Sequence, residues 1–204
     1  MVIMDPETGE VLAMYGGSGE KTADLTLNRA TQMRRAAGST FKPIAVYGPA
    51  LDQQLITAAT VIDDVPVYMN PQKPDERYPQ NFAETINGVY ARHYRGLTTI
   101  RTAIARSINV VAARVFNEVL GADLSFEYLQ KSGISMEGEG KYVSIALGGL
   151  KNGVSPLQMT AAYAPFVNEG VYLSPITYTQ VLDVDGTVLL DKRKTESVKQ
   201  EQNI

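Results

Sequence analysis

A serine and a lysine at helical spacing are the residues of this sequence best suited to chemistry. Ser39 and Lys42 are three positions apart, and residues at that spacing lie on the same face of a helix. Gly38 lets the backbone turn just before the serine, and the apolar run from Ile44 to Leu51 predicts a helix with a buried face. If burial keeps the Lys42 amine partly neutral, it can take the proton of the Ser39 hydroxyl. Ser39 is therefore predicted to be a nucleophile and Lys42 its base, with helix N-terminal N–H groups available to an oxyanion.

A second polar pair lies downstream, at the expected junction of two helices over residues 98–106 and 110–120. Ser107 and Asn109 are separated only by Ile108, and in a loop both side chains can point into one cleft. Ser107 could then relay a proton to a leaving nitrogen, while Asn109 could hold a substrate amide and fix the Lys42 amine. The structural alternative makes Ser107 a helix cap and Asn109 a solvated side chain.

The composition excludes several other classes of site. The chain has 204 residues, 44% of them hydrophobic, and its 19 Lys and Arg against 22 Asp and Glu give a net charge of −3, as in an ordinary globular domain. The absence of Cys excludes disulfides, thiolate metal sites and a cysteine nucleophile, and a single His leaves no imidazole-based zinc site. Basic residues are scattered, so no nucleic-acid partner is expected. No cofactor or metal is predicted.

Local patterns predict the elements that must position these residues. Two β-hairpins are expected, over residues 1–14 around a Pro-Gly turn and over residues 178–190 around Asp185-Gly186. A capping box from Ser155 to Gln158 should begin a helix that Pro165 breaks. Asp123 should cap a short helix that ends at Gly133. Residues 63–82 should form a long irregular segment. The loop at 16–19 is glycine-rich, and a plain connector is favoured over a phosphate-binding loop because no Lys-Ser or Lys-Thr opens a helix after it.

The chemistry-bearing segments resemble a known family. Similarity to the transpeptidase domain of bifunctional, high-molecular-weight (class A) penicillin-binding proteins extends over residues 35–43, 107–109 and 146–159, and the opening residues 3–14 are similar to that domain's first hairpin. The resemblance implies an α/β fold of the α+β type, in which an antiparallel sheet is flanked by helices. It also implies a peptidoglycan D,D-transpeptidase that forms a serine acyl-enzyme with D-Ala-D-Ala stem peptides. By resemblance Ser39 is the acylated nucleophile, Lys42 its base, and Ser107 and Asn109 the second element, with Asn109 also binding substrate. β-Lactams would acylate Ser39 as substrate mimics.

One element of the family pattern is missing from the sequence. The family has a Lys-Thr-Gly on the strand facing the serine, whereas Lys21-Thr22-Ala23 and Lys194-Thr195-Glu196 both lack the glycine. We therefore expect residues 1–204 to be the N-terminal part of one transpeptidase domain, completed by a second polypeptide segment that carries this strand. The resemblance further implies a position at the extracytoplasmic face of the bacterial plasma membrane, anchored by a segment outside this chain.

Other functions remain open at this point. The same scaffold could act as a D,D-carboxypeptidase or a β-lactamase, in which water replaces the acceptor amine. Glu84 and Glu127 are present, but nothing in the sequence places either in the cleft. A non-catalytic penicillin-recognising sensor or scaffold is the rival of a different class. His93 is interpreted as a surface or rim residue rather than part of a Ser-His-Asp triad. Four aromatic residues could line the groove or pack the rim: Tyr78, Phe82, Tyr90 and Tyr94.

Overall fold

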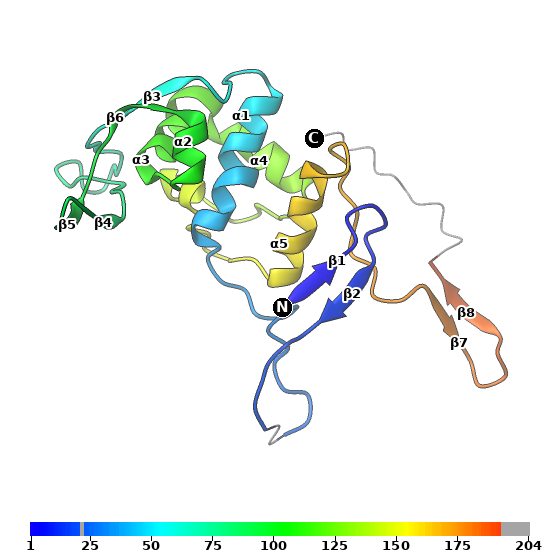
Figure 1. Cartoon of the computed structure of the whole chain (residues 1–204). Helices are drawn as coiled ribbons and strands as arrows, with labels where there is room; N and C mark the ends of the chain where they lie inside the picture. The colour runs from blue at the N-terminus through cyan, green and yellow to red at the C-terminus, as the bar shows by residue number, and fades with distance from the viewer. Residues whose placement is uncertain (21–22, 193–204) are drawn as a thin grey trace. The chain divides into compact units, whose positions relative to one another are not determined.

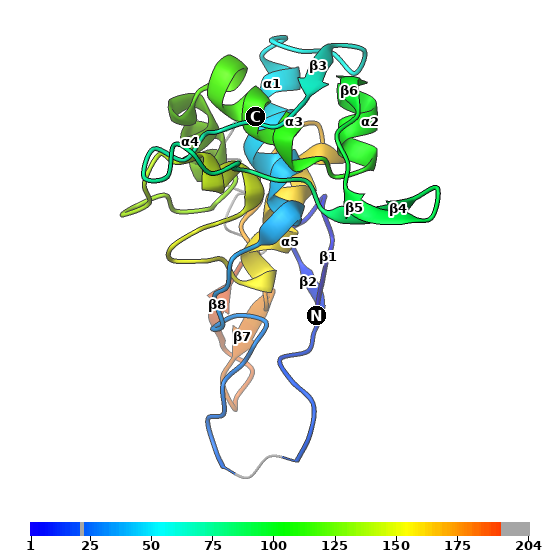
Figure 2. The same ribbon diagram turned by 90° about the vertical axis from the view of Figure 1, so that its left-hand side faces the viewer.

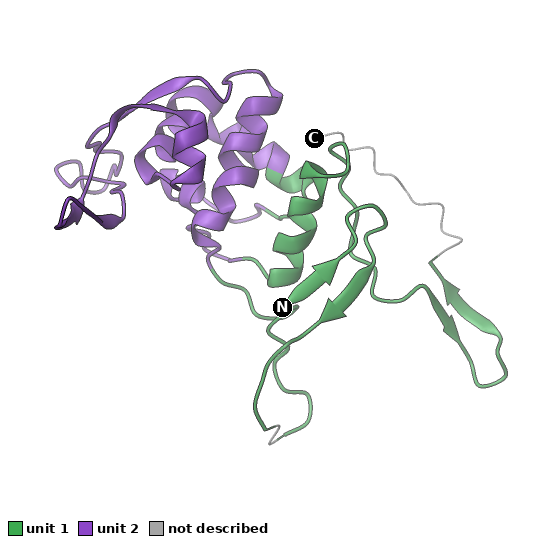
Figure 3. Cartoon of the chain, in the orientation of Figure 1, with its two compact units in different colours: residues 1–35, 129–135, 154–204 green, residues 36–128, 136–153 purple. Residues whose placement is uncertain are grey.

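The chain folds into two compact units. The computed structural model describes residues 1–20 and 23–192 (Figure 1). Unit 1 comprises residues 1–35, 129–135 and 154–204, and unit 2 comprises residues 36–128 and 136–153 (Figure 3). The four predicted site residues all belong to unit 2. No helix in the described part of the chain is long and apolar enough to cross a membrane.

Unit 1 is built from two hairpins and a helix. These described elements are β1 (Val2–Met4) paired with β2 (Val11–Met14), β7 (Gln180–Leu182) paired with β8 (Val188–Asp191), and α5 (Pro156–Tyr163). Both pairings are antiparallel, so the two predicted hairpins are confirmed. Helix α5 packs against β1 (Figure 1). A further segment runs beside the first hairpin, because the Val11 N–H donates to Ile176 O at 2.8 Å.

The ends of α5 follow the sequence pattern. The Gln158 N–H donates to Ser155 Oγ at 3.2 Å, and the Ser155 N–H donates to Gln158 Oε1 at 3.1 Å. This reciprocal pair is the predicted capping box, and it satisfies N–H groups that have no partner within the helix. The helix ends at Tyr163 and is followed by a 3₁₀ turn, Ala164–Phe166. The predicted break at Pro165 is confirmed.

Unit 2 contains most of the helices. In chain order its described elements are a 3₁₀ helix (Gly38–Phe41), a π-helix (Pro43–Tyr47), α1 (Gly48–Asp52), β3 (Val61–Asp64), β4 (Ala83–Ile86), β5 (Val89–Arg92), β6 (Gly96–Thr99), α2 (Ile100–Ala105), α3 (Asn109–Arg114), a second π-helix (Val115–Leu120), most of α4 (Ala122–Lys131) and a 3₁₀ helix (Val143–Leu147). Strand β3 pairs with β6 and β4 with β5, both antiparallel. The β4–β5 hairpin projects from the helices of this unit (Figure 2).

The core of unit 2 lies beneath the Ser39 turn. Phe41, Val46, Ile100, Phe116 and Ile145 are all fully buried. Each is worth roughly 1.5–3 kcal/mol of transfer free energy relative to exposure. They come from five separate segments, so this core fixes the helices that carry Lys42 and Asn109 relative to each other.

Three sequence-based boundaries were wrong. The irregular segment does not include Asp63 and Asp64, which belong to β3. The helix expected over residues 98–106 begins at Ile100, because Thr98 and Thr99 complete β6 and the Thr99 side chain accepts the Thr102 N–H as a cap. Helix α4 begins at Ala122, so Asp123 lies in its first turn instead of capping it.

The fold class is as expected, with a difference in how the strands are grouped. Helices accompany antiparallel strands, which confirms an α/β fold of the α+β type. In the described residues the strands form four separate two-stranded ladders instead of one sheet. A pair of strands is marginally stable alone and depends on packing against other elements.

Candidate active site

The Ser39 turn begins with a left-handed glycine. Gly38 has a φ of +60°, a conformation that costs other residues about 1–2 kcal/mol. The 3₁₀ helix then presents Ser39 at a half-buried position, and Thr40 Oγ1 closes the turn by donating to Ala37 O at 2.7 Å. Within the described chain, the Ser39 hydroxyl makes no hydrogen bond. Its oxygen therefore has no hydrogen-bond partner among the described residues.

Lys42 is buried and makes three close polar contacts. Its side chain is 2% exposed. Lys42 Nζ donates to Ser107 O at 2.6 Å, to Ser107 Oγ at 3.0 Å and to Asn109 Oδ1 at 2.6 Å. The structure therefore brings Lys42, Ser107 and Asn109 together. The backbone N–H of Lys42 donates to Ser39 O, but within the described residues no hydrogen bond joins Lys42 Nζ to the Ser39 hydroxyl.

Burial changes the protonation of Lys42. It lowers the pKa of the Lys42 amine to about 8, because the charged form is deprived of water. At pH 7 roughly one amine in ten is then neutral, compared with fewer than about one in a thousand for an ordinary lysine. A base poised near the working pH is what proton abstraction from a hydroxyl requires.

The backbone geometry does not fit the alternative in which Ser107 caps a helix and Asn109 is solvated. Ser107 has a φ of +52°, which is uncommon for a non-glycine residue and reverses the chain between α2 and α3. The N-cap of α3 is Ile108, so Ser107 does not cap that helix. Asn109 is the first residue of α3 and is 9% exposed. Asn109 is therefore not a solvated side chain.

Asn109 is held by more than Lys42. Asn109 Nδ2 donates to Gln80 O at 2.8 Å, and this bond fixes the amide so that Oδ1 faces the lysine. The segment before β4 therefore contributes to the site. The sequence analysis treated residues 63–82 as an irregular rim and did not anticipate this contact.

A close backbone contact supports the Ser39 turn. Gly148 follows the 3₁₀ helix Val143–Leu147 with a φ of +74°. A Cβ at this position would lie 2.2 Å from Gly38 O and 2.5 Å from Gly38 N. Only glycine permits this approach. The adjacent Gly148-Gly149 pair in the sequence was the available signal, but sequence reasoning did not connect it with Gly38.

The other candidate residues lie at the margin of the site. A small hollow beside Ser107 is also lined by Phe82, Glu84, His93 and Arg95. Glu84 Oε1 is 2.5 Å from Arg95 Nη2, so the carboxylate is held in an ion pair. His93 is half-buried, and its Nε2 lies 3.4 Å from Val89 O.

The aromatic candidates and Glu127 differ in exposure. Phe82 and Tyr90 are 66% and 74% exposed, while Tyr78 and Tyr94 are half-buried. Glu127 is exposed on α4. Lys21, Thr22 and the segment 194–196 lie outside the described residues.

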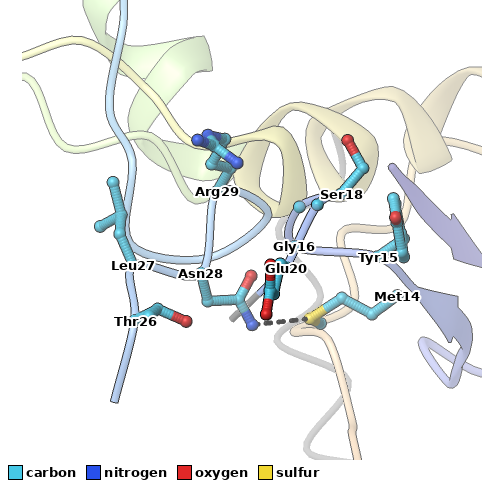
Figure 4. A pocket seen from close by; sticks show the side chains of 11 residues that line it. Met14, Tyr15, Gly16, Ser18, Glu20, Thr26, Leu27, Asn28 and Arg29 are labelled. Carbon is cyan, nitrogen blue, oxygen red and sulfur yellow. Dashed lines mark hydrogen bonds between the residues drawn. The ribbon is translucent and has the colours of Figure 1, made fainter. Parts of the chain in front are cut away.

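A larger hollow lies in unit 1, next to the glycine-rich loop. It is lined by residues 14–20 and 26–29, and Asn28 Nδ2 donates to Met14 Sδ at 3.9 Å across it (Figure 4). The loop leads into a turn at 29–32 rather than a helix, and its lining includes Glu20. This favours the connector over the phosphate-binding loop. Across the described part of the chain, no group of three or more His, Cys, Asp or Glu side chains is placed to hold a metal ion.

Comparison with known proteins agrees with the resemblance of the motifs. The family described as the penicillin binding protein transpeptidase domain matches residues 1–204. Penicillin-binding protein 1A of Clostridium tetani is 39% identical over 96% of this chain, and penicillin-binding protein 1F of Bacillus subtilis is 34% identical over 95%. The chain spans about a quarter of the length of these curated relatives, at 25% and 24%.

Solved structures give the same result. Penicillin-binding protein 1A from Haemophilus influenzae aligns with a TM-score of 0.75 and 28% identity, over 93% of this chain and 26% of that one. The PonA1 protein from Mycobacterium tuberculosis in complex with penicillin V aligns with a TM-score of 0.71 and 24% identity, over 94% and 49%. The chain belongs to the penicillin-binding protein transpeptidase family.

Proposed function

We propose that the protein containing this chain is a peptidoglycan D,D-transpeptidase that forms an acyl-enzyme on Ser39. The observation that carries the proposal is the buried Lys42 amine, held 2.6 Å from Asn109 Oδ1 and 3.0 Å from Ser107 Oγ, three residues after an unengaged serine. Burial lowers the pKa of the Lys42 amine to about 8, so part of it is uncharged near neutral pH. A partly neutral amine of this kind suits a general base.

In the proposed first step, Ser39 Oγ attacks the carbonyl carbon of the penultimate D-Ala while neutral Lys42 takes the hydroxyl proton. The C–O bond forms as the peptide C–N bond breaks, and the leaving D-Ala nitrogen must gain a proton. Lys42 Nζ has three hydrogen-bond partners. Two of them, Ser107 O and Asn109 Oδ1, are oxygens that can accept but cannot donate a proton. Ser107 Oγ is the third, and a hydroxyl can both give and accept a proton. Ser107 is therefore assigned the relay from Lys42 to the leaving nitrogen.

The second step consumes the acyl-enzyme. An amine from another stem peptide attacks the ester carbonyl, loses its proton through the same groups, and releases Ser39 Oγ with its hydrogen restored. A β-lactam follows only the first step, in which the ring amide opens onto Ser39. Asn109 is assigned to the substrate amide, since its side chain is already fixed at the base.

Substrate binding requires more than the described residues supply. The sequence contains no Lys-Thr-Gly, so we propose that a second polypeptide segment carries that strand and completes the domain. This makes residues 1–204 the N-terminal part of the domain. Stem peptides as substrates place the protein at the extracytoplasmic face of the bacterial plasma membrane.

Hydrolysis is the alternative outcome for the same acyl-enzyme. A β-lactamase or D,D-carboxypeptidase needs a water-activating group at the acyl ester. The carboxylate that lines the hollow beside Ser107, Glu84, is instead paired with Arg95. This favours transfer to an amine over transfer to water.

The proposal is tested by covalent labelling with a fluorescent penicillin, in the protein with its completing segment. The wild type and an exposed-loop control, Ser18→Ala, should label stably, whereas Ser39→Ala should not label at all. Failure of the wild type to label would overturn the proposal. Rapid loss of label from the wild type would favour the hydrolase, and an unchanged cross-linking phenotype in Ser39→Ala cells would favour the non-catalytic sensor or scaffold.

A further inference from the structure

The buried amide of Asn81 joins α3 and β3 to the segment between β5 and β6. Asn81 precedes β4 and is 7% exposed. Its Oδ1 accepts the Asn109 N–H at 3.1 Å and the Val110 N–H at 3.2 Å. Its Nδ2 donates to Asp64 Oδ1 at 2.8 Å and to His93 O at 3.1 Å. Every hydrogen-bonding position of this amide is used, so its orientation is fixed.

The first pair of these bonds replaces a missing helix cap. The N-cap of α3, Ile108, has no side chain able to accept the free N–H groups of the first turn. Asn81 Oδ1 accepts two of them from outside the helix. The next residue back, Gln80, accepts from Asn109 Nδ2 at 2.8 Å. Residues 80 and 81 thus hold both the backbone and the side chain of Asn109.

The second pair of bonds anchors Asn81 to a buried carboxylate. Asp64 in β3 is completely buried. Its Oδ1 accepts from Asn81, and its Oδ2 accepts the Arg95 N–H at 3.0 Å. Burying an ionised carboxylate is costly unless hydrogen bonds compensate it, so a polar network of this kind is expected to be rigid when every member is satisfied.

We propose that Asn81, anchored by Asp64, is a positioning residue that sets the place of Asn109 Oδ1 at Lys42. The argument rests on the proposed function, because it concerns the alignment of the same base. Among the described residues, no hydrogen bond joins Asn81 to Lys42, so its proposed effect on the base passes through Asn109. A shift of about 1 Å in a catalytic contact can reduce a rate on the order of 100-fold, which gives a buried residue one step away from Lys42 a measurable effect.

The test begins with a single substitution, Asn81→Asp, and then exchanges the side chains of Asn81 and Asp64. Asn81→Asp keeps an acceptor for the α3 N–H groups, but it removes both donors and sets a second carboxylate against Asp64. We expect the acylation rate at saturating penicillin to fall on the order of 100-fold, with little change in the concentration giving half-maximal rate. Asn117→Asp, exposed on the following π-helix, is the matched control and should acylate like the wild type.

The double variant Asn81→Asp/Asp64→Asn restores one donor and one acceptor between the two positions. We expect it to recover acylation to within about tenfold of the wild type, since a single hydrogen bond of the network is then lost. If Asn81→Asp does not fold, the acylation rate of the double variant tests the inference in its place. A folded double variant that remains as slow as the single variant would overturn the inference, as would wild-type acylation by Asn81→Asp. If the wild type itself fails to label, the proposed function has failed instead.

Discussion

Two regions of the molecule differ in which side chains they bury: one buries a charged side chain, and the other exposes apolar ones. Around Lys42 in unit 2, a charged side chain is 2% exposed and makes three hydrogen bonds. In the β7–β8 hairpin of unit 1, Leu182, Leu189 and Leu190 are 51%, 59% and 53% exposed. Exposed leucines gain little from folding, whereas a buried amine is tolerated only where its surroundings are fixed. The polar contacts of unit 2 thus compensate the burial of the Lys42 amine, whereas the hairpin leaves apolar side chains exposed.

Removing the base should give the largest effect. Lys42→Met keeps the length and the apolar stem of the side chain but cannot accept a proton. We expect the acylation rate by penicillin to fall about 10²–10⁴-fold, the usual contribution of a general base. Stopped-flow acylation measures this directly. Lys151→Met, on an exposed lysine, is the control and should be unaffected. A loss below about threefold in Lys42→Met would exclude Lys42 as the base.

Filling the contact beneath the Ser39 turn should be the next largest change. Gly148→Ala places a Cβ 2.2 Å from Gly38 O, and the positive φ adds about 1–2 kcal/mol of backbone strain. We expect a loss of more than about 3 kcal/mol in the free energy of unfolding, measured by urea denaturation. Gly138→Ala has a similar φ of +72° with only Asn152 Nδ2 nearby, at 3.8 Å. That variant isolates the strain, so equal losses in both would show that the contact with Gly38 is unimportant.

The pH dependence of acylation should be smaller but more specific. Burial lowers the pKa of Lys42 to about 8, and the neutral amine is the active form. The rate should therefore rise about tenfold between pH 7 and pH 9 and then level off. A profile that is flat over this range, or that rises only near the ordinary lysine value of about 10.4, would contradict the assignment.

A substitution in the hairpin should have the smallest effect in this comparison. Leu189→Ser removes an apolar side chain that is 59% exposed. If nothing covers β8, the free energy of unfolding should change by less than about 0.5 kcal/mol. A loss above about 1.5 kcal/mol in the complete protein would show that another segment buries this leucine. Comparing this variant in the chain alone and in the complete protein sharpens the contrast between the two regions.

Local patterns allowed part of the fold to be predicted from the sequence. Turn residues and the Ser155 capping box gave both hairpins of unit 1 and the start of α5, because these signals act through neighbouring residues. The β4–β5 hairpin was missed although Asn87-Gly88 lies at its turn, with φ values of 51° and 79°. Asn-Gly is a strong signal for such a turn, but the prolines and low periodicity before it favoured an irregular interpretation.

The sequence allowed the residues of the candidate site to be predicted, but not the contacts between them. Ser39, Lys42, Ser107 and Asn109 were chosen by type and spacing, and three of them meet at the lysine. Their roles remain predictions. Spacing along a helix did not reveal that the Lys42 amine bonds to Ser107 and Asn109 instead of the Ser39 hydroxyl. Nor did it reveal the contacts of Asn81 with α3 and of Gly148 with Gly38. These contacts join segments distant in sequence, and only tertiary packing determines them.

The most direct test is to locate the penicillin adduct in the protein. Trypsin should release residues 36–77 as one peptide, because Lys42 and Lys73 each precede proline. Fragmentation of that peptide after incubation with penicillin should place the added mass on Ser39. An adduct on Ser107 or any other residue, or recovery of the peptide unmodified from fully inhibited protein, would contradict the assignment of Ser39 as the nucleophile.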